Sequence, residues 1–141
     1  MKVLIDTNVI ISAILKDKIP EKILLFVISN ENIHWIVSSD ILKEYEEILK
    51  RPKFKLPDAL ISKWCGMIQK FSHLIDVKDG YKFSRDQKDS IFINCALASN
   101  ADFLISGDRD FENFQFKNNT KIISVSSFNA LIIEGPLYSS H

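Results

Sequence analysis

The sequence predicts an α/β fold, as a single three-layer α/β/α domain with a central, mostly parallel sheet of four to five strands. The apolar pattern switches along the chain between runs of three or four residues and longer stretches with helical spacing. Strands separated by helices need crossover connections, which give parallel pairing and cover both faces of the sheet. The 141 residues are 46% hydrophobic with Gly 4 and Pro 4, which suits one domain with a sizeable core and excludes a disordered or collagen-like chain.

The chain opens with a strand followed by two helices. Lys2–Ile5 is expected to be a buried strand because its Val-Leu-Ile run is apolar throughout. Either residue of the Thr7–Asn8 pair is a candidate N-cap for a helix that ends near Leu15. Pro20 occupies a good first-turn position for a second helix over residues 21–29.

The middle of the chain repeats the strand-to-helix order. The His-Trp-Ile-Val run at His34–Val37 is expected to be a strand. The polar residues 38–40 form a cap signal for a helix that ends near Lys50, because Arg51-Pro52 cannot continue it. Residues 57–71 have the apolar spacing of another helix.

The last third is predicted to close the sheet. We expect residues 1–134 to form one domain and residues 135–141 to be a mobile tail. The expected elements are a weak strand at Leu74–Val77, a helix over 87–99 capped by Ser84 or Asp86, strands at Phe103–Ile105 and Lys121–Val125, and a helix over 126–133 capped by Ser126.

Cysteine usage, apolar runs and charge limit the function classes. Cys65 and Cys95 form no Cys-x-x-Cys pair, so we expect neither a disulfide scaffold nor a common zinc site, and a reduced, cytoplasmic setting. The apolar runs are too short to span a bilayer, so no membrane association is expected. With 18 basic and 18 acidic residues the net charge is zero, which argues against binding of nucleic acid by bulk charge alone.

Acidic side chains recur where the predicted strands end. Asp6 follows the first strand and Asp108 follows Phe103–Ile105 by three residues. Glu44 lies on the helix after the second strand, and Asp89 lies in the first turn of its own helix. Because ligands of parallel sheets bind beyond the carboxyl ends of the strands, we expect at least three of these segments to converge on one edge.

Glu44 is distinguished from its neighbours by helical spacing. On a helix over residues 41–49, Glu44 lies at the edge of the apolar stripe, three residues after Ile41 and four before Ile48. Glu46 and Glu47 lie further toward solvent. A carboxylate at the boundary that only snorkels to solvent is the simpler interpretation of Glu44 taken alone.

Each of the other acids also has an ordinary structural role available. Asp6 suits a helix N-cap, Asp86 and Asp89 suit the positive end of a helix dipole, and Asp108 and Asp110 suit turns. Taken together, they would repel one another: two carboxylates about 5 Å apart repel by roughly 3 kcal/mol at an effective dielectric constant of about 20. Such a cluster must take up protons, face open water or bind a cation, and an all-oxygen site favours Mg²⁺ or Mn²⁺.

These residues resemble the PIN-domain family of ribonucleases, and within it the small prokaryotic toxins of toxin–antitoxin pairs, similar to VapC. The resemblance covers nearly the whole chain and rests on an ordered set of motifs. The matching pieces are Val-Leu-Ile-Asp-Thr-Asn at 3–8, Ser39 with Glu44, Arg85-Asp86 with Asp89, and Ser-Gly-Asp-Arg-Asp-Phe at 106–111.

The resemblance implies a PIN-like fold, a metal-dependent endoribonuclease and a set of site residues. The catalytic, metal-binding acids would be Asp6, Glu44, Asp89 and Asp108, with Asp86 and Asp110 as neighbouring acids that bind the metal through water. Hydrogen bonds from Thr7, Asn8, Ser39 and Ser106 would support them. One departure is Lys88, which stands where several relatives carry an acid and makes the local charge less negative.

The expected chemistry is attack by a metal-bound water on an RNA phosphodiester bond, without a histidine base. RNA phosphates would meet the basic stretch Arg51, Lys53 and Lys55, with Phe54 free to stack on a base, although a solvated loop explains this stretch equally well. Arg85 and Arg109, beside the acids, would meet phosphate or pair with Asp86 and Asp110. The apolar stripe of residues 57–71 suits a core, a homodimer or an antitoxin groove, and the resemblance raises the expectation of both partners.

Two other function classes compete with the nuclease. A non-catalytic RNA-binding or scaffold protein with a degenerate PIN fold is compatible with the neutral net charge and with Lys88. A small phosphotransfer or phosphatase domain would need a second acid in place of Asn8, as Asp-x-Asp after the first strand, and no Gly-rich phosphate loop is present.

Overall fold

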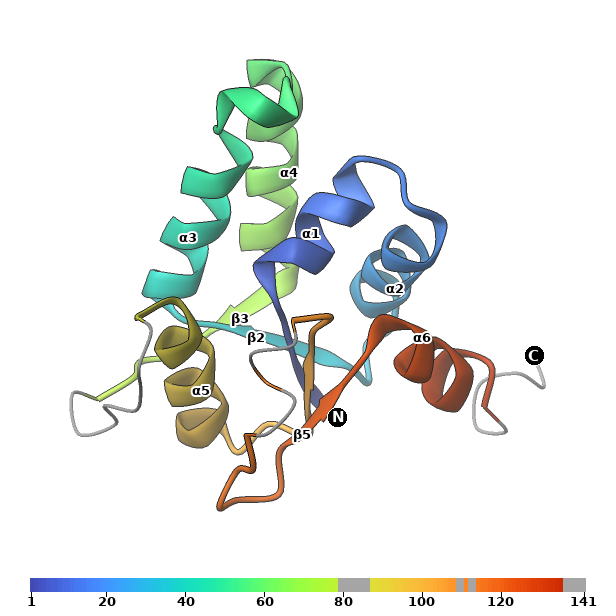
Figure 1. Ribbon diagram of the computed structural model, residues 1–141, viewed down its shortest axis with the longest axis vertical. Coiled ribbons are helices and arrows are strands. Elements are labelled where there is room, and N and C mark those ends of the chain that lie inside the picture. The colour runs from blue at the N-terminus through green and yellow to red at the C-terminus, as the bar shows by residue number, and fades with distance from the viewer. Residues whose placement is uncertain (79–86, 109–110, 112–113, 136–141) are drawn as a thin grey trace.

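A five-stranded, entirely parallel sheet forms the centre of the computed structural model, which describes residues 1–78, 87–108, 111 and 114–135, without the side chains of 87–89. The strand order is β3-β2-β1-β4-β5 (Figure 1). The strands are β1 (Lys2–Ile5), β2 (His34–Val37), β3 (Ser72–Leu74), β4 (Phe103–Ile105) and β5 (Lys121–Ile123). The α/β prediction is confirmed, and the sheet reaches the upper end of the expected four to five strands.

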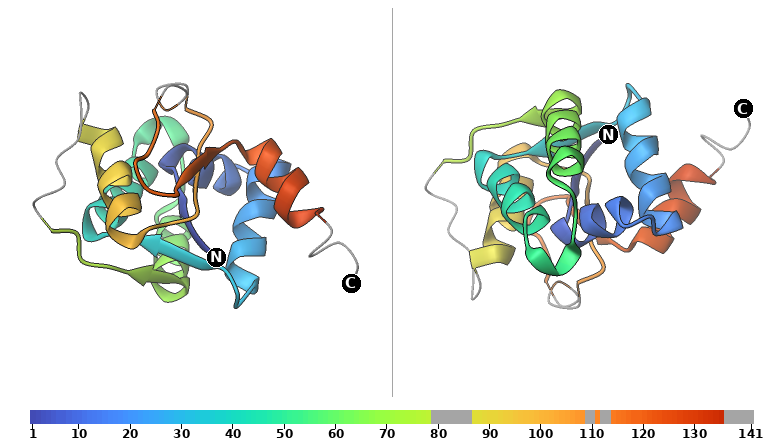
Figure 2. Two further views of the ribbon diagram at one scale, coloured as in Figure 1. Left: turned by 90° about the horizontal axis from the view of Figure 1, so that it is seen from below. Right: turned by 90° about the horizontal axis from the view of Figure 1, so that it is seen from above.

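Helices connect the strands and cover the sheet (Figures 1 and 2). α5 packs across β1, β2 and β4, while α2 contacts β2 and α4 contacts β3. α3 and α4 form an antiparallel hairpin that rises away from the sheet. The helices are α1 (Thr7–Ile14), α2 (Lys18–Ser29), α3 (Ser39–Leu49), the 3₁₀ turn η1 (Pro52–Phe54), α4 (Asp58–Phe71), α5 (Gln87–Ser99), α6 (Val125–Phe128) and the π-helical turn η3 (Asn129–Ile133). Of these described helices, none combines the length and the apolar character that a membrane crossing requires.

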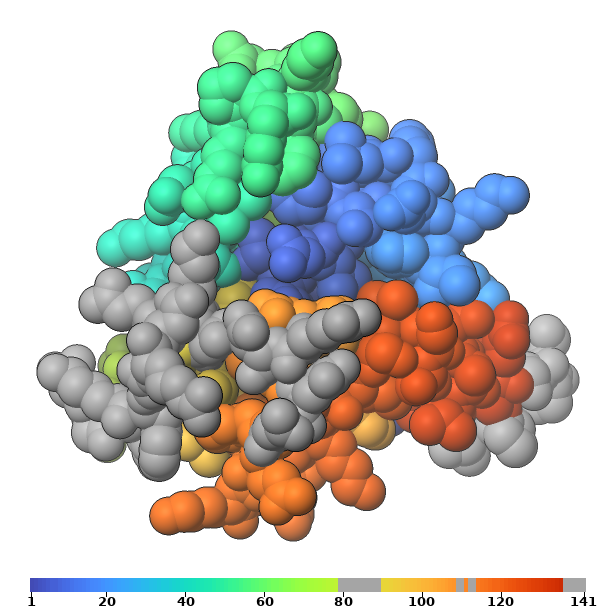
Figure 3. Space-filling view, viewed as in Figure 1, coloured from blue at the N-terminus to red at the C-terminus, as the bar shows by residue number. Residues whose placement is uncertain are grey.

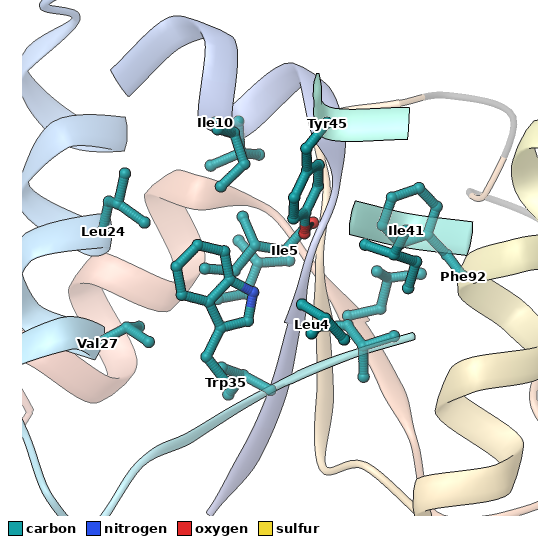
Figure 4. Close-up of a cluster of buried hydrophobic side chains, with 14 of the residues drawn as sticks. Leu4, Ile5, Ile10, Leu24, Val27, Trp35, Ile41, Tyr45 and Phe92 are labelled. Atoms are coloured by element: carbon teal, nitrogen blue, oxygen red, sulfur yellow. Dashed lines mark hydrogen bonds between the residues drawn. The ribbon is translucent and has the colours of Figure 1, made fainter. Parts of the chain in front are cut away.

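The hydrophobic core lies where α1, α2, α3 and α5 meet β1 and β2 (Figure 4). Val3, Leu4 and Ile5 have no exposed surface, as expected for a central strand that is covered on both faces. Trp35, Tyr45 and Phe92 are among the largest fully buried side chains. Cys65 and Cys95 are both free thiols, in line with the expectation that the fold needs no disulfide.

Several element boundaries differ from those predicted. α2 begins at Lys18 rather than at Glu21, so that Pro20 falls within its first turn. β3 lies two residues earlier than expected, at Ser72–Leu74, because α4 leads directly into it and the ladder pairs Trp35 with Ser72. β5 ends at Ile123.

The helix caps also differ from those predicted. The N-cap of α1 is Asp6, the ordinary structural role considered for it above, and not Thr7 or Asn8; its side chain accepts a hydrogen bond from the amide of Thr7. The N-cap of α6 is Ser124 rather than Ser126, and it accepts from the amide of Ser127. Asp6 directly follows β1, which ends at Ile5 as predicted, whereas the cap moves to Ser124 because β5 ends at Ile123 and not at the predicted Val125. The predicted cap of α5 at Ser84 or Asp86, and most of the predicted tail, lie outside the described residues.

The strand order creates a switch point between β1 and β4. From β1 the chain moves to β2 and β3 on one side, and then crosses to β4 and β5 on the other side of β1. Helices that leave neighbouring strands in opposite directions open a crevice at the carboxyl ends of those strands, where ligands of such sheets bind. Asp6 and Ser106 are the residues that directly follow β1 and β4.

Candidate active site

Asp6 lies at the switch point and is buried, with 7% of its surface exposed. Its Oδ1 accepts a hydrogen bond from the Thr7 amide at 2.8 Å, and its Oδ2 accepts one from the Ser106 hydroxyl at 2.7 Å. The amide of Asp6 continues the ladder to β4 by donating to the Ile105 carbonyl at 2.9 Å. Both the backbone and the carboxylate of Asp6 are therefore fixed by neighbouring strand ends.

Burial raises the pKa of the Asp6 carboxyl from 3.8 to about 6. The hydrogen bonds from Ser106 and Thr7 oppose this shift, because they stabilise the charged form. Repulsion from Asp108 and Glu44 adds to the increase, which shows that both acids lie within electrostatic range of Asp6. A carboxylate in these surroundings gains stability from a proton or from a cation.

Glu44 reaches this region from α3. It is half-buried, whereas Glu46 and Glu47 are exposed, as the helical spacing predicts. The hydroxyl of Thr7, itself buried, donates a hydrogen bond to the Glu44 carboxylate. Because Thr7 directly follows Asp6, this bond connects the first helical residue after β1 to α3.

Ser106 connects Asp6 to Asp108. Its hydroxyl donates to Asp6 and accepts a hydrogen bond from the Asp108 amide at 3.0 Å. Ser106 is buried and Asp108 is half-buried. One hydroxyl therefore sets the position of two acids that are separated by 102 positions in the chain.

Tyr45, on the apolar stripe of α3, helps to hold this helix against β1, a role that its position in the stripe did not predict. The ladder between β1 and β2 pairs Lys2 with His34 and Val3 with Trp35, while the ladder between β1 and β4 continues to Ile5. The buried Tyr45 hydroxyl donates to the Ile5 carbonyl, on the side where β1 has no further pair with β2. The signal in the sequence was a tyrosine in an otherwise apolar stripe, since a buried hydroxyl needs a partner.

The remaining predicted site residues fall into two groups, those that the structure describes and those that lie outside the described residues. Asn8 and Ser39 are exposed, and neither side chain makes a hydrogen bond to any residue that the structure describes. Ser38, the residue before Ser39, is buried and caps α3 through the Ile41 amide at 3.2 Å. The backbone of Asp89 lies in the first turn of α5, as predicted, but its side chain is outside the described part. Asp86, Asp110, Arg85 and Arg109 also lie outside the described residues.

The donor set suits a hard divalent cation. Asp6, Glu44 and Asp108 supply carboxylate oxygens, the ligand type that Mg²⁺ and Mn²⁺ prefer, and the hydroxyls of Thr7 and Ser106 hydrogen-bond to two of these carboxylates. Within the described side chains, no three His, Cys, Asp or Glu residues are close enough together to form a metal site by themselves. The described acids alone would leave much of the coordination shell of such an ion to water.

The predicted RNA-binding stretch forms the tip of the hairpin of α3 and α4, at the top of the molecule (Figure 3). Lys53 and Lys55 are exposed and Arg51 is half-exposed. Phe54 packs against the core instead of standing free, and the Lys53 ammonium lies 5.1 Å from its ring centroid. The cations of this tip are accessible, whereas the aromatic ring supports the hairpin.

Comparison with known proteins identifies the fold family. The family model of the PIN domain matches residues 2–110, which include every acid discussed above. The chain belongs to the PIN-domain family. The resemblance stated from the sequence is thereby confirmed, and PIN-domain membership supports a hydrolase that acts on nucleic acids.

Two known proteins are similar to this PIN domain. The uncharacterized protein MJ1680 of Methanocaldococcus jannaschii is 33% identical over 122 residues, which are 84% of this chain and 77% of that protein. Among solved structures, this PIN domain is similar to a chain of VapBC2 from Rickettsia felis bound to a DNA fragment from their promoter. The TM-score is 0.63 at 19% identity, covering 88% of this chain and 98% of that one, which shows a shared fold.

Proposed function

We propose that this PIN domain is a divalent-metal-dependent endoribonuclease and the toxin of a toxin–antitoxin pair. The observation that carries the proposal is the set of hydrogen bonds at the switch point, in which the Ser106 hydroxyl joins the Asp6 carboxylate to the Asp108 amide and the Thr7 hydroxyl binds the Glu44 carboxylate. Evolutionary kinship with PIN domains supports nucleic acid as the substrate. The VapBC2 similarity supports the toxin role.

In this proposal the acids hold the metal and the hydroxyls hold the acids. Asp6, Glu44, Asp89 and Asp108 would bind Mg²⁺ or Mn²⁺, with Asp86 and Asp110 reaching it through water. When bound, the ion polarises the scissile phosphodiester and supplies an activated water for in-line attack. Ser106 joins the Asp6 carboxylate to the backbone of Asp108, and Thr7 binds the Glu44 carboxylate, so these two hydroxyls would orient the acids that receive the ion.

The decisive experiment is cleavage of a labelled single-stranded RNA by wild type and by Asp6→Asn, with Mn²⁺ or with excess EDTA. We expect cleavage by wild type with Mn²⁺ only, and a loss of at least 100-fold in Asp6→Asn, because changes even at residues that only support metal ligands typically cost 10- to 100-fold. Asp76→Asn, an exposed acid on a loop, is the matched control and should retain full activity. Full activity in EDTA would exclude the metal-dependent mechanism.

The competing non-catalytic hypothesis is separated from the nuclease by metal binding. We expect Mn²⁺ to raise the melting temperature of wild type but not of Asp6→Asn, since an ion that binds only the folded state stabilises it by mass action. At an Mn²⁺ concentration of 100 times Kd the stabilisation is about 2.7 kcal/mol. A degenerate PIN fold that only binds RNA would show no such shift.

The partners in the proposal are an RNA substrate, an antitoxin protein and a second copy of the chain. Expression of wild type in a bacterial host should arrest growth, and expression of Asp6→Asn should not. Light scattering should give twice the monomer mass of 16.2 kDa for the purified chain. If the wild type cleaves RNA in vitro but its expression leaves growth normal, the chain is a nuclease and not a toxin.

A further inference from the structure

A hollow of about 690 Å³ opens beside the acids, along the outer edge of β5. Ser106 and Asp108 line one end of it, and these are the residues that also bond to or repel the Asp6 carboxylate. The other walls come from β5 and from the loop that precedes it. The hollow therefore continues directly from the candidate active site and is large enough for a nucleotide-sized ligand.

Two aromatic rings, Phe114 and Phe116, line the hollow. Phe114 and Phe116 are half-buried, and their ring centroids lie 4.8 Å apart in an edge-to-face arrangement at 79°. Both rings pack against the hydrophobic core, as Phe54 does, but unlike Phe54 they also line the hollow beside the candidate active site. Aromatic faces beside a phosphate-handling site are typical platforms for bases of single-stranded RNA.

The polar groups of the hollow match the rest of a nucleotide. Lys121 and Gln115 line the hollow and are exposed. A lysine ammonium suits a phosphate of the RNA backbone, and an amide side chain can donate to and accept from the edge of a base. An extended peptide added to the edge of β5 would use the backbone of that strand, but it would gain nothing from the shared wall with the acids, so the observations favour RNA.

We propose that this hollow binds one unstacked nucleobase of the RNA, next to the scissile phosphate, with Phe114 or Phe116 as its stacking platform. This inference rests on the proposed nuclease function, and it adds a subsite that selects single-stranded over paired RNA. A base within a duplex is stacked and paired, so it cannot enter such a hollow without being flipped out.

The test uses a fluorescein-labelled single-stranded RNA that wild type cleaves at one position, and a series in which one base at a time is replaced by an abasic ribose. The variants are Phe114→Leu and Phe116→Leu, which keep an apolar side chain of similar size but remove the aromatic face. Tyrosine at the same positions restores the face. Phe71→Leu, at an exposed aromatic on α4 outside the hollow, is the matched control.

We expect one abasic position next to the cleaved bond to raise KM of wild type by roughly 5- to 100-fold, the effect of one lost base–aromatic stack. In at least one leucine variant the intact RNA should show this same increase, and the abasic RNA should show no further loss, because both changes remove one contact. The tyrosine variant should recover the wild-type KM. Additive effects of the two changes, or unchanged KM in both leucine variants, would overturn the proposal.

Binding of the same RNAs in EDTA, followed by fluorescence anisotropy, separates this inference from the proposed function. We expect the same pattern of affinities without any cleavage. If wild type cleaves RNA but both leucine variants bind and cleave as wild type does, the subsite is wrong and the nuclease stands. If wild type cleaves no RNA, the proposed function fails, and equal affinity for intact and abasic RNA in EDTA then overturns the subsite too.

Discussion

The burial of the Asp6 carboxyl costs the folded state free energy when the carboxyl is charged. Its unfolded pKa is near 3.8 and its folded pKa is about 6, so the folded state binds the proton more tightly than the unfolded state does. Above pH 6 the folded state must hold a buried charge, which is repelled by Asp108 and Glu44. Such a cost is expected where an anionic cluster is kept ready for a cation.

We therefore predict that Asp6→Asn stabilises the metal-free protein at neutral pH. For wild type in EDTA, the free energy of unfolding should fall by up to about 3 kcal/mol as the pH rises from 4 to 7, because the raised pKa of Asp6 favours folding only while the carboxyl is protonated. Asparagine is an equally good N-cap and carries no charge, so the variant should lose most of this decline. Urea denaturation at pH 4, 6 and 8 measures it.

The control for that measurement is Asp76→Asn, which should keep the wild-type pH dependence because Asp76 is exposed. A decline with pH of the same size in Asp6→Asn would mean that another group causes it. The opposite order in Mn²⁺, with wild type more stable than the variant, would show that the same carboxylate stabilises the fold once the ion is present.

At the scale of elements, Tyr45 joins α3 to the end of β1. Burial raises the pKa of the Tyr45 phenol well above its ordinary value, so the hydroxyl stays protonated and donates to the Ile5 carbonyl. Ile5 precedes Asp6, and Glu44 precedes Tyr45, so this single bond relates the backbones that carry two of the acids. The helix is thereby held at a fixed distance from the strand.

Tyr45→Phe should weaken both the fold and the metal site. The Ile5 carbonyl would be left without its partner, which lowers the free energy of unfolding by about 1–3 kcal/mol. Because α3 would lose its tie to β1, we also expect weaker Mn²⁺ binding by calorimetry. Ile48→Val on the same buried side of α3 is the control, since it removes one methyl group and should leave Mn²⁺ affinity unchanged. Equal Mn²⁺ affinity in Tyr45→Phe and wild type would contradict the positioning role.

The end of α1 offers a second prediction at this scale. Lys16 has φ 73°, and the amides of Lys16 and Asp17 donate to the carbonyls of Ala13 and Ser12, which is a Schellman motif with lysine where glycine is usual. The left-handed conformation costs a non-glycine residue about 1–2 kcal/mol. Lys16→Gly should therefore raise the free energy of unfolding by about 0.5–1 kcal/mol, after the greater chain entropy of glycine is subtracted.

Thermal and urea denaturation of Lys16→Gly measure this increase. Lys16→Ala is the control, because it also removes the exposed contact with Glu21 but keeps the strained backbone. A contact of this kind contributes little, so alanine should be near neutral or slightly destabilising. If glycine and alanine gave the same stability, the backbone conformation would not be the cause.

At the scale of the whole molecule, periodicity predicted which segments form strands and helices but not how the strands are ordered. Asp6 and Glu44 could be selected from local sequence, since one directly follows an apolar run and the other lies at the edge of a helical stripe. The hydroxyl of Ser106 could not be assigned to Asp6 in this way, because that bond exists only when β4 lies beside β1. The boundaries of β3 and the partner of Tyr45 were missed for the same reason, since both depend on contacts between distant segments.

The charge distribution gives the last prediction. The net charge is zero and the candidate site is acidic, so RNA, the proposed substrate, would need a local group of cations to attract it. Lys53 and Lys55 are exposed at the tip of the hairpin, and α3 carries them roughly 10 Å beyond Glu44 at 1.5 Å per helical residue. A phosphate a few nucleotides from the cleaved bond would meet them there.

We predict that Lys53→Glu with Lys55→Glu weakens binding of single-stranded RNA and flattens its salt dependence. Each phosphate contact contributes a slope of about −0.7 to log K against log salt, so the loss of two should reduce the slope by about 1.4. Lys70→Glu, at the other end of α4, is the control and should leave the slope unchanged. Anisotropy titrations between 50 and 200 mM salt measure it, and an unchanged slope in the double variant would mean that the tip is a solvated loop which RNA does not touch.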